Sequence, residues 1–241
     1  MPANFEEIDY QEAPLGPVSR RRQRLKMLDD REIHEVKLGN DYLMSSLFTK
    51  VEEELARLGL AATPGDSLDV VVGGLGLGYT AWTALEDPRI ASLIVVDYLQ
   101  PVIEWHQRGL VPLGPKLTAD PRCRFVHGDY FALAAAEGAG FDPDQPQRQF
   151  DAVLLDIDHS PDHLLHPQHA DYYSAEGLRS FSRLIRPGGV FGLWSDDPPE
   201  ERFLANLQAV FAEVKTEVVA FPNPFLHRDS ESTVYVCRLA G

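Results

Sequence analysis

The sequence has few cysteines, few basic residues and no long apolar run, and each shortage excludes a class of protein. Its two cysteines, Cys123 and Cys237, lie far apart and form no CxxC pair, which favours buried reduced thiols over a disulfide framework or a thiolate metal site. Lysine and arginine number 22 against 37 aspartates and glutamates, a formal net charge of −15. This balance argues against nucleic acid as a partner and is compatible with a cationic small substrate.

No segment approaches the roughly 18 consecutive apolar residues that a membrane span needs. The N-terminal stretch "MPANFEEIDYQEAP" is acidic and has no apolar run of the kind found in signal peptides. We therefore expect a cytoplasmic protein that does not bind membranes. With 241 residues, 44% of them apolar, the chain is long enough to bury a sizeable core.

Residues 1–48 are predicted to form a small N-terminal β-hairpin subdomain. After a loose acidic lead over residues 1–13, "PLGPVSRRRQRL" and "REIHEVKLGNDYLMSS" have the composition of strands, and the second turns at Gly39–Asp41. The arginines at positions 20, 21, 22 and 24 are interpreted as solvated charges on an edge strand, where they would prevent further strand pairing. An anion site is the less favoured interpretation.

Residues 49–241 are predicted to form a Rossmann-like domain. A helix is expected over residues 51–58, and from Ser67 onward short β-branched runs alternate with amphipathic segments, which is typical of a mostly parallel sheet covered on both faces. Ser174 is the expected N-cap of one helix, and another helix begins near Pro199. The last two runs, "EVKTEVVAF" and "STVYVCRL", follow one another without a helix, which predicts an antiparallel last strand.

The stretch "VVVGGLGLGYTAW" predicts a strand, a glycine turn and the start of a helix. Its glycines Gly74, Gly76 and Gly78 form a GxGxG pattern, whereas a nicotinamide fingerprint would need a further glycine at Tyr79. GxGxG suits ligands of the S-adenosylmethionine type, which have no pyrophosphate. A tight turn that merely requires glycine is the alternative.

Three further predicted strands end in carboxylates, at the edge where an open parallel sheet binds its ligand. Asp97 follows "SLIVV" and can accept hydrogen bonds from a ribose. The Gly128–Asp129 pair follows "CRFVH" and can accept from an adenine amino group. Asp156 follows "AVLL" and would face the transferable group. For Asp97 and Asp129, helix capping is the competing interpretation.

The run from Leu68 to Trp194 resembles the spermidine and spermine synthases, a branch of the class I S-adenosylmethionine-dependent methyltransferase fold. The resemblance lies in "VVDYLQPVIE", "LTADPRCRFVHGDYF" and "FDAVLLDIDHSP", and the predicted N-terminal hairpin is laid out like the small β-domain of that family. It implies that Asp97 binds the ribose, that Asp129 binds the adenine and that Asp156 lies beside the reacting amine. It also implies a homodimer.

The chain departs from that family at three places. The family's GGGDGG is "GGLGLG" here, so that Gly76 replaces an aspartate that in the family helps to hold the ammonium end of decarboxylated S-adenosylmethionine. The family's DSSDP is "DIDHSP", which puts His159, or Asp158 in its stead, where a second amine-binding carboxylate belongs. The family's YxEM stretch is also absent, and "SSLFTKVEEE" stands there.

A sulfonium donor is already activated, so transfer requires mainly an aligned, unprotonated nucleophile. Asp156 can hold an ammonium and accept its proton, with Asp158 and His159 as further catalytic candidates. We expect an S-adenosylmethionine-dependent transferase whose reaction is methyl transfer to a small, amine-bearing acceptor, because the glycine-turn aspartate is missing. Aminopropyl transfer from decarboxylated S-adenosylmethionine to a polyamine is the alternative, and a non-catalytic module that binds nucleosides or polyamines is the second alternative.

The segment "DHSPDHLLHPQHADYY" is rich in histidine and tyrosine. Pro161 and Pro167 work against the continuous helix that would align its histidines, so a loop that covers the ligand is expected and a metal site is not. Tyr172, Tyr173 and Trp194 are candidates for the wall of the acceptor pocket, with core packing as the alternative for Trp194.

Overall fold

The structure, a computed structural model, describes residues 5–241 and begins with a four-stranded antiparallel sheet. Its strands follow chain order, with the one-turn 3-10 helix η1 (Lys26–Leu28) between the second and third; they are β1 (Phe5–Ala13), β2 (Gly16–Leu25), β3 (Arg31–Leu38) and β4 (Asp41–Ser45). The predicted turn between β3 and β4 is confirmed. The predicted loose lead is wrong from Phe5 onward, and residues 1–4 lie outside the described residues.

The arginine-rich strand β2 lies inside this sheet, between β1 and β3, so the edge-strand interpretation is wrong. Arg21 and Arg22 form ion pairs with Glu7 and Glu6 of β1, which explains why an acidic segment becomes a strand: its charges are neutralised across the strand pair. Arg20 is only 3% exposed and donates a hydrogen bond to Nδ1 of His34 over 2.9 Å.

The second sheet has seven strands in the order β10-β11-β9-β8-β5-β6-β7. The members are β5 (Leu68–Gly73), β6 (Ile90–Asp97), β7 (Cys123–His127), β8 (Phe150–Leu155), β9 (Ile185–Ser195), β10 (Glu213–Asn223) and β11 (Arg228–Arg238). Strands β5 to β9 are mutually parallel, and β11 is antiparallel to β9 and to β10. The Rossmann-like sheet with an antiparallel last strand is thus confirmed, and its strand order reverses between β5 and β8.

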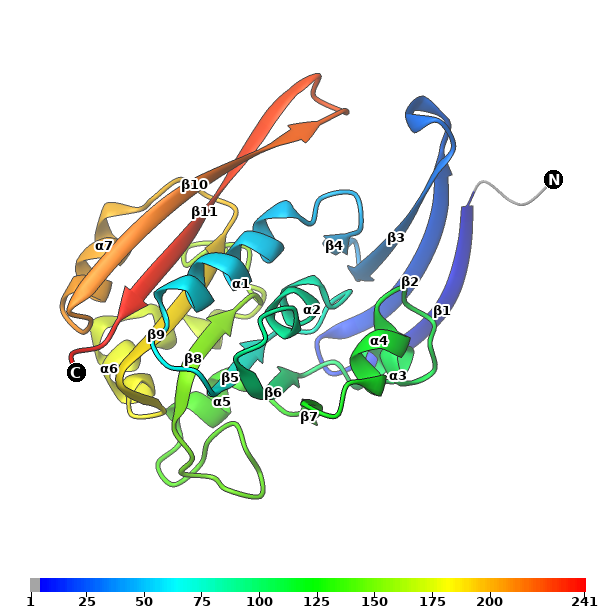
Figure 1. The fold of residues 1–241 in the computed structure, drawn as a ribbon. Coiled ribbons are helices and arrows are strands. Elements are labelled where there is room, and N and C mark those ends of the chain that lie inside the picture. Colours follow the sequence, from blue (N-terminus) through cyan, green and yellow to red (C-terminus); the bar gives the residue numbers. More distant parts are fainter. Residues whose placement is uncertain (1–4) are drawn as a thin grey trace.

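Helices cover both faces of this sheet (Figure 1). One face carries α1 (Lys50–Ala62), α2 (Tyr79–Leu85), α3 (Gln100–Gln107) and α4 (Gly114–Ala119); the other carries α5 (Tyr130–Ala135), the 3-10 helix η2 (Pro167–Tyr173), α6 (Ala175–Ser182) and α7 (Glu201–Gln208). In β5, Val70 and Val72 join the first core and Val71 the second, as the alternation of a strand requires. Ser174 caps α6 as predicted, since its Oγ accepts from the N–H of Gly177 over 3.0 Å.

Helix α1 packs very closely on the sheet, and glycines make this possible. A Cβ on Gly59 would lie 2.5 Å from Cδ2 of Leu154 in β8, and one on Gly192 in β9 would lie 3.0 Å from Cδ1 of Leu55. Such contacts leave no room for a side chain at either position. The fit fixes α1 across β8 and β9.

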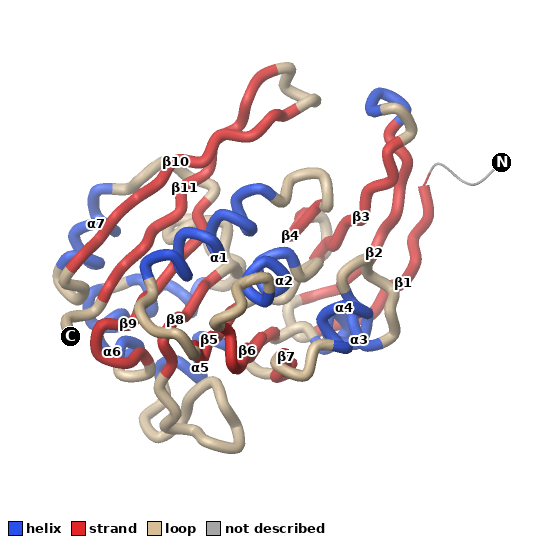
Figure 2. Tube along the Cα trace, viewed as in Figure 1, coloured by secondary structure: helices blue, strands red, loops and turns tan. Residues whose placement is uncertain are grey.

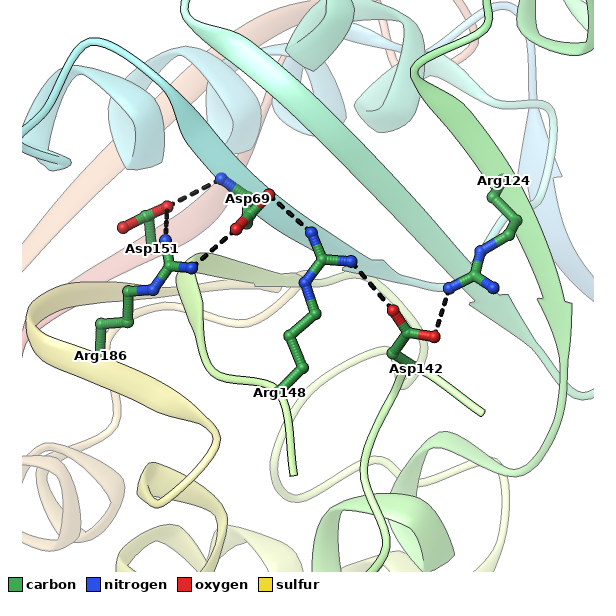
Figure 3. A network of polar contacts seen from close by, with 6 residues as sticks. All are labelled: Asp69, Arg124, Asp142, Arg148, Asp151 and Arg186. Atoms are coloured by element: carbon green, nitrogen blue, oxygen red, sulfur yellow. Dashed lines mark hydrogen bonds and ion pairs between the residues drawn. The ribbon is translucent and has the colours of Figure 1, made fainter. Parts of the chain in front are cut away.

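A network of arginines and aspartates joins the amino ends of the central strands (Figure 3). Open parallel sheets bind their ligands at the opposite, carboxyl edge. Arg148 donates to Asp69 over 2.6 Å and to Asp142 over 2.9 Å. Arg186 bridges Asp69 and Asp151. These pairs tie the loop before β8 to β5 and have no part in the cavity described below.

The β10–β11 hairpin is longer than the sheet that supports it. Strand β11 pairs with β9 only from Thr233 to Arg238, so the turn end of the hairpin projects past β9, on the same side of the molecule as the β2–β3 hairpin (Figures 1 and 2). Phe221 and Phe225 of this projecting part contact Phe48. Within residues 5–241, no helix combines the length and apolar character needed to cross a membrane.

Candidate active site

A cavity of about 1010 Å³ opens at the carboxyl ends of the central strands. The N-terminal sheet contributes Val36 and Met44 to its wall, the projecting hairpin contributes Phe221, and the loop after β8 contributes His159. The cavity therefore lies at the point where strand order reverses, which is where open α/β sheets bind ligands.

The glycine turn forms the floor of this cavity. Gly74, Gly76 and Gly78 have φ angles of 94°, 46° and 91°, a region that side chains disfavour. A Cβ on Gly74 would also lie 2.0 Å from the carbonyl oxygen of Asp156. Gly74 and Gly76 line the cavity, where their contact with a ligand stays a prediction, whereas Gly78 is packed against Leu117 and does not line it.

Two side chains hold the turn from outside. His106 is fully buried, which lowers its pKa to about 4, so that neutral His106 donates from Nε2 to the carbonyl of Gly76 over 3.0 Å. Met44 Sδ accepts from the N–H of Leu77 over 2.9 Å and would lie 2.8 Å from a Cβ on Gly76. The methionine sulfur thus fills the space that a side chain at position 76 would need.

Asp97 ends β6 beside the turn, with 8% of its surface exposed. Its two oxygens accept from the N–H groups of Leu75 and Leu99 over 2.8 and 2.7 Å. Burial raises its pKa, and these backbone hydrogen bonds oppose the rise. Asp97 faces the cavity, so it is placed both to bind a ligand and to hold the turn.

Asp129 also faces the cavity, while the neighbouring Gly128 does not. The Oδ1 of Asp129 accepts from the N–H of Ala132 over 3.1 Å and so caps α5. One carboxylate oxygen remains free of this contact. The capping interpretation therefore holds, and the adenine role stays a prediction.

Asp156 follows β8 and faces the cavity across the glycine turn. Burial raises its pKa to about 6, opposed by a hydrogen bond of 2.8 Å from the hydroxyl of Thr80. Thr80 is the second residue of α2, which begins directly after the glycine turn. The candidate catalytic carboxylate of Asp156 is thus hydrogen-bonded to the helix that follows the glycine turn.

The structure separates the other two catalytic candidates. Asp158 does not line the cavity; it accepts hydrogen bonds from the N–H of Leu165, the ring of His169 and the hydroxyl of Tyr173. These contacts anchor the loop after β8. His159 lines the cavity, and its carbonyl accepts from the N–H of Asp196 over 2.7 Å.

The aromatic candidates also divide. Tyr172 and Trp194 line the cavity, whereas Tyr173 is buried in the core, 5.8 Å from the ring of Phe203. In the described part of the chain, no cluster of three or more histidine, cysteine, aspartate or glutamate side chains has a geometry that would bind a metal ion.

Three further residues of the site, Glu52, Thr80 and Met44, were not predicted from the sequence. Glu52 lies in the first turn of α1 and faces the cavity with Asp196. Burial, and then the charge of Asp156, raises the pKa of Glu52 well above its usual range. Its signal in the sequence was the acidic start of a helix, which is common because the helix dipole favours it, so the residue did not stand out.

Solved structures with the same arrangement of elements define the fold. The spermidine synthase of Thermotoga maritima aligns with a TM-score of 0.70 and 15% identity over 96% of this chain and 72% of that one. A spermidine synthase in complex with the transition-state analogue AdoDATO aligns with a TM-score of 0.69 and 14% identity over the same shares. The fold is that of the spermidine synthases. A probable spermidine synthase from Corynebacterium glutamicum gives 0.65 and 14% over 95% of this chain and 79% of that one.

Sequence similarity agrees with this spermidine synthase-like fold. A polyamine aminopropyltransferase from Nitrosomonas europaea is 28% identical over 160 residues, which are 64% of this chain and 45% of that protein. This chain thus matches less than half the length of that relative. No family model matches the chain. The names of these proteins favour aminopropyl transfer, the alternative of the sequence analysis, and give no support to methyl transfer.

Proposed function

We propose that this protein transfers an aminopropyl group from decarboxylated S-adenosylmethionine to an amine acceptor. The observation that carries the proposal is the charge of the cavity wall. Seven carboxylate side chains line it within the described residues, against one lysine and no arginine; they are Glu35, Glu52, Asp97, Asp129, Asp156, Asp171 and Asp196. The lysine, Lys50, donates from Nζ to the carbonyl of Ala220 over 2.8 Å.

This charge discriminates between the two donors. S-adenosylmethionine carries a carboxylate, which an acidic cavity repels unless a cation compensates it. Decarboxylated S-adenosylmethionine has lost that group and keeps a sulfonium and an ammonium, both of which carboxylates attract. The name of the Nitrosomonas europaea relative supports the same choice.

The residues have distinct proposed roles in the reaction. Gly74 and Gly76 allow the nucleoside to approach the turn, and Asp97 and Asp129 accept hydrogen bonds from it. Asp156 takes a proton from the acceptor ammonium. The freed amine nitrogen then bonds to the propyl carbon next to the sulfonium, the C–S bond breaks, and its electron pair leaves with the sulfur as a neutral thioether.

Mass spectrometry of the acceptor tests the proposal. Purified protein is incubated with 1,4-diaminobutane and either decarboxylated or intact S-adenosylmethionine. We expect the diamine to gain one aminopropyl group with the first donor and nothing with the second. A gain of one methyl group from intact S-adenosylmethionine would replace the proposal by methyl transfer, and binding without turnover would leave a non-catalytic module.

Substitution of Asp156 tests its role. Asp156→Asn keeps the shape but cannot accept a proton, so transfer should fall by about 10²–10⁴ while the affinity for 5′-methylthioadenosine stays near wild type. Asp162→Asn is the matched control, because Asp162 is an exposed aspartate in the same loop that does not line the cavity. Asp156→Asn activity within about threefold of wild type, well below that range, would remove Asp156 from the mechanism.

A further inference from the structure

Glu52 reaches the cavity because of the way in which α1 is seated on the sheet. The close contacts of Gly59 with Leu154 and of Leu55 with Gly192 fix the helix across β8 and β9. Its first turn then lies at the carboxyl edge of the sheet, where Glu52 and Asp156 line the same cavity. After burial, the charge of Asp156 is the largest influence that raises the pKa of Glu52.

No cation compensates these two carboxylates within residues 5–241. The ion pairs of this part of the chain include neither residue. Lys50, two positions before Glu52, is bound to the carbonyl of Ala220, and Arg57 of the same helix pairs with Glu53 and Glu54. The charges of Glu53 and Asp196 also raise the pKa of Glu52, and the charge of Glu52 in turn raises the pKa of Tyr79. Asp196 and His159 both line the cavity.

Hydrogen bonding tells which of the two carboxyl groups holds a proton. Asp156 accepts from the hydroxyl of Thr80, and such a bond favours its charged form. No side-chain donor in the described residues does the same for Glu52, whose pKa is raised by burial and by the charge of Asp156. The proton of this pair is therefore held mainly by Glu52, whose pKa is raised well above its usual range, while the hydrogen bond from Thr80 favours the charged form of Asp156.

We propose that Glu52 and Asp156 act as one proton-sharing pair that receives the primary ammonium of the acceptor and releases the proton of Glu52 to solvent as the ammonium binds. The amine nature of the acceptor rests on the proposed function. An ammonium between the two groups supplies the positive charge that the protein does not, and so favours ionisation of both.

The pair then completes the proton balance of the transfer. The bound ammonium gives one proton to the doubly ionised pair and becomes a neutral amine. Its nitrogen forms the new C–N bond as the C–S bond breaks, and the product is a secondary ammonium that keeps its two hydrogens. One ammonium and one sulfonium thus yield one secondary ammonium, one thioether and one proton, which the pair holds in its resting form.

Calorimetry with 1,4-diaminobutane as the probe tests this pair. Binding is measured at pH 7 in buffers with different ionisation enthalpies, in the presence of 5′-methylthioadenosine, so that the dependence on buffer gives the number of protons released. Wild type should release about one proton per site because Glu52 ionises. Glu52→Gln, which mimics the protonated glutamate, should release none and bind at least tenfold more weakly.

Glu54→Gln is the matched control, since Glu54 lies on the same helix and pairs with Arg57; it should behave as wild type. The proposal is overturned if wild type releases no proton, if Glu52→Gln releases as many protons as wild type, or if the diamine does not bind.

Carboxyl carbon NMR of the unliganded protein gives a readout that is independent of turnover. Wild type should show two coupled titrations, and Glu52→Gln should lose the one at higher pH while Asp156 still titrates near pH 6. Proton release without any aminopropyl product would contradict the proposed function and leave the pair intact. If Glu52→Gln transfers the aminopropyl group at the wild-type rate and with the wild-type pH profile, the proposed pair is contradicted and the proposed function stands.

Discussion

The hydroxyl of Thr80 donates a hydrogen bond of 2.8 Å to Oδ2 of Asp156. Thr80 is the second residue of α2, after the glycine turn, and Asp156 directly follows β8, so this contact spans the place where the strand order reverses. It is also the contact that opposes the effect of burial on the pKa of Asp156. The position of α2, which follows the glycine turn, thereby affects the pKa of Asp156, the residue proposed as the base.

Thr80→Val should raise the pKa of Asp156 above its value of about 6. Removal of one hydrogen bond to a charged group, worth about 1.5–3 kcal/mol, corresponds to roughly 1–2 pH units. The acidic limb of the kcat/KM profile should move upward by that amount. Thr83→Val, a buried position of the same helix, should not move it, and a superimposable Thr80→Val profile would show that the hydroxyl does not tune Asp156.

Asp97→Ala should weaken binding of 5′-methylthioadenosine by about ten- to a hundredfold, because charged hydrogen bonds to the ribose are worth about 1.5–3 kcal/mol. The melting temperature should fall as well, since the N–H groups of Leu75 and Leu99 lose their acceptor. Calorimetry and thermal unfolding measure the two effects separately. A lower melting temperature with unchanged affinity would make Asp97 a purely structural residue.

Asp156→Asn should stabilise the unliganded protein at pH 7. The pKa of Asp156 is raised in the fold from 3.8 to about 6, so the folded state binds more protons than the unfolded state between these values and stability falls as pH rises through them. The amide removes this loss, which we estimate at about 1–2 kcal/mol because the group faces a cavity. Urea unfolding at pH 4 and pH 7 should show the gain at pH 7, and a variant less stable than wild type there would contradict it.

Gly76→Asp should lower both stability and nucleoside binding. The new side chain would collide with Met44, whose sulfur lies 2.8 Å from the Cβ position, and the residue has a φ of 46°. The double variant Gly76→Asp with Met44→Ala should recover part of the loss, because the two sites share one volume. Additive losses in the double variant would show that Met44 does not occupy that space.

Arg148→Met should lower the free energy of unfolding by about 1–3 kcal/mol through the loss of partners for Asp69 and for Asp142, which is 2% exposed. Burial raises the pKa of Asp142, but hydrogen bonds from Arg124 and Arg148 outweigh it and hold the pKa below its usual value. The stability from this group is present above the unfolded pKa of about 4 and is lost on acidification, so the deficit should shrink at low pH.

Arg57→Met is the control for this prediction, because Arg57 is a half-exposed partner of Glu53 and Glu54 on α1. It should change stability by no more than about 0.5 kcal/mol. Neither variant should alter nucleoside binding, since neither Arg148 nor Arg57 lines the cavity. Equal losses in both variants would mean that burial adds nothing to the network.

The sequence alone determined the alternation of strands and helices, the glycine turn and the carboxylates that end β6 and β8. These features depend on the periodicity of apolar residues and on the positions of glycine, and both can be recognised within a short stretch of sequence. The capping serine Ser174 and the antiparallel end of the sheet follow from the same local rules. The sequence also showed that glycine replaces the family's aspartate at position 76. It did not show that the sulfur of Met44 lies where a side chain at that position would be.

Only the tertiary structure decided which side chains meet in the cavity. The first strand forms because its glutamates face arginines of β2, and Asp158 turns into the loop because His169 and Tyr173 lie there. Glu52 reaches Asp156 because glycines let α1 sit tightly on β8 and β9. Each of these outcomes depends on contacts between residues far apart in the chain, which a local pattern does not encode.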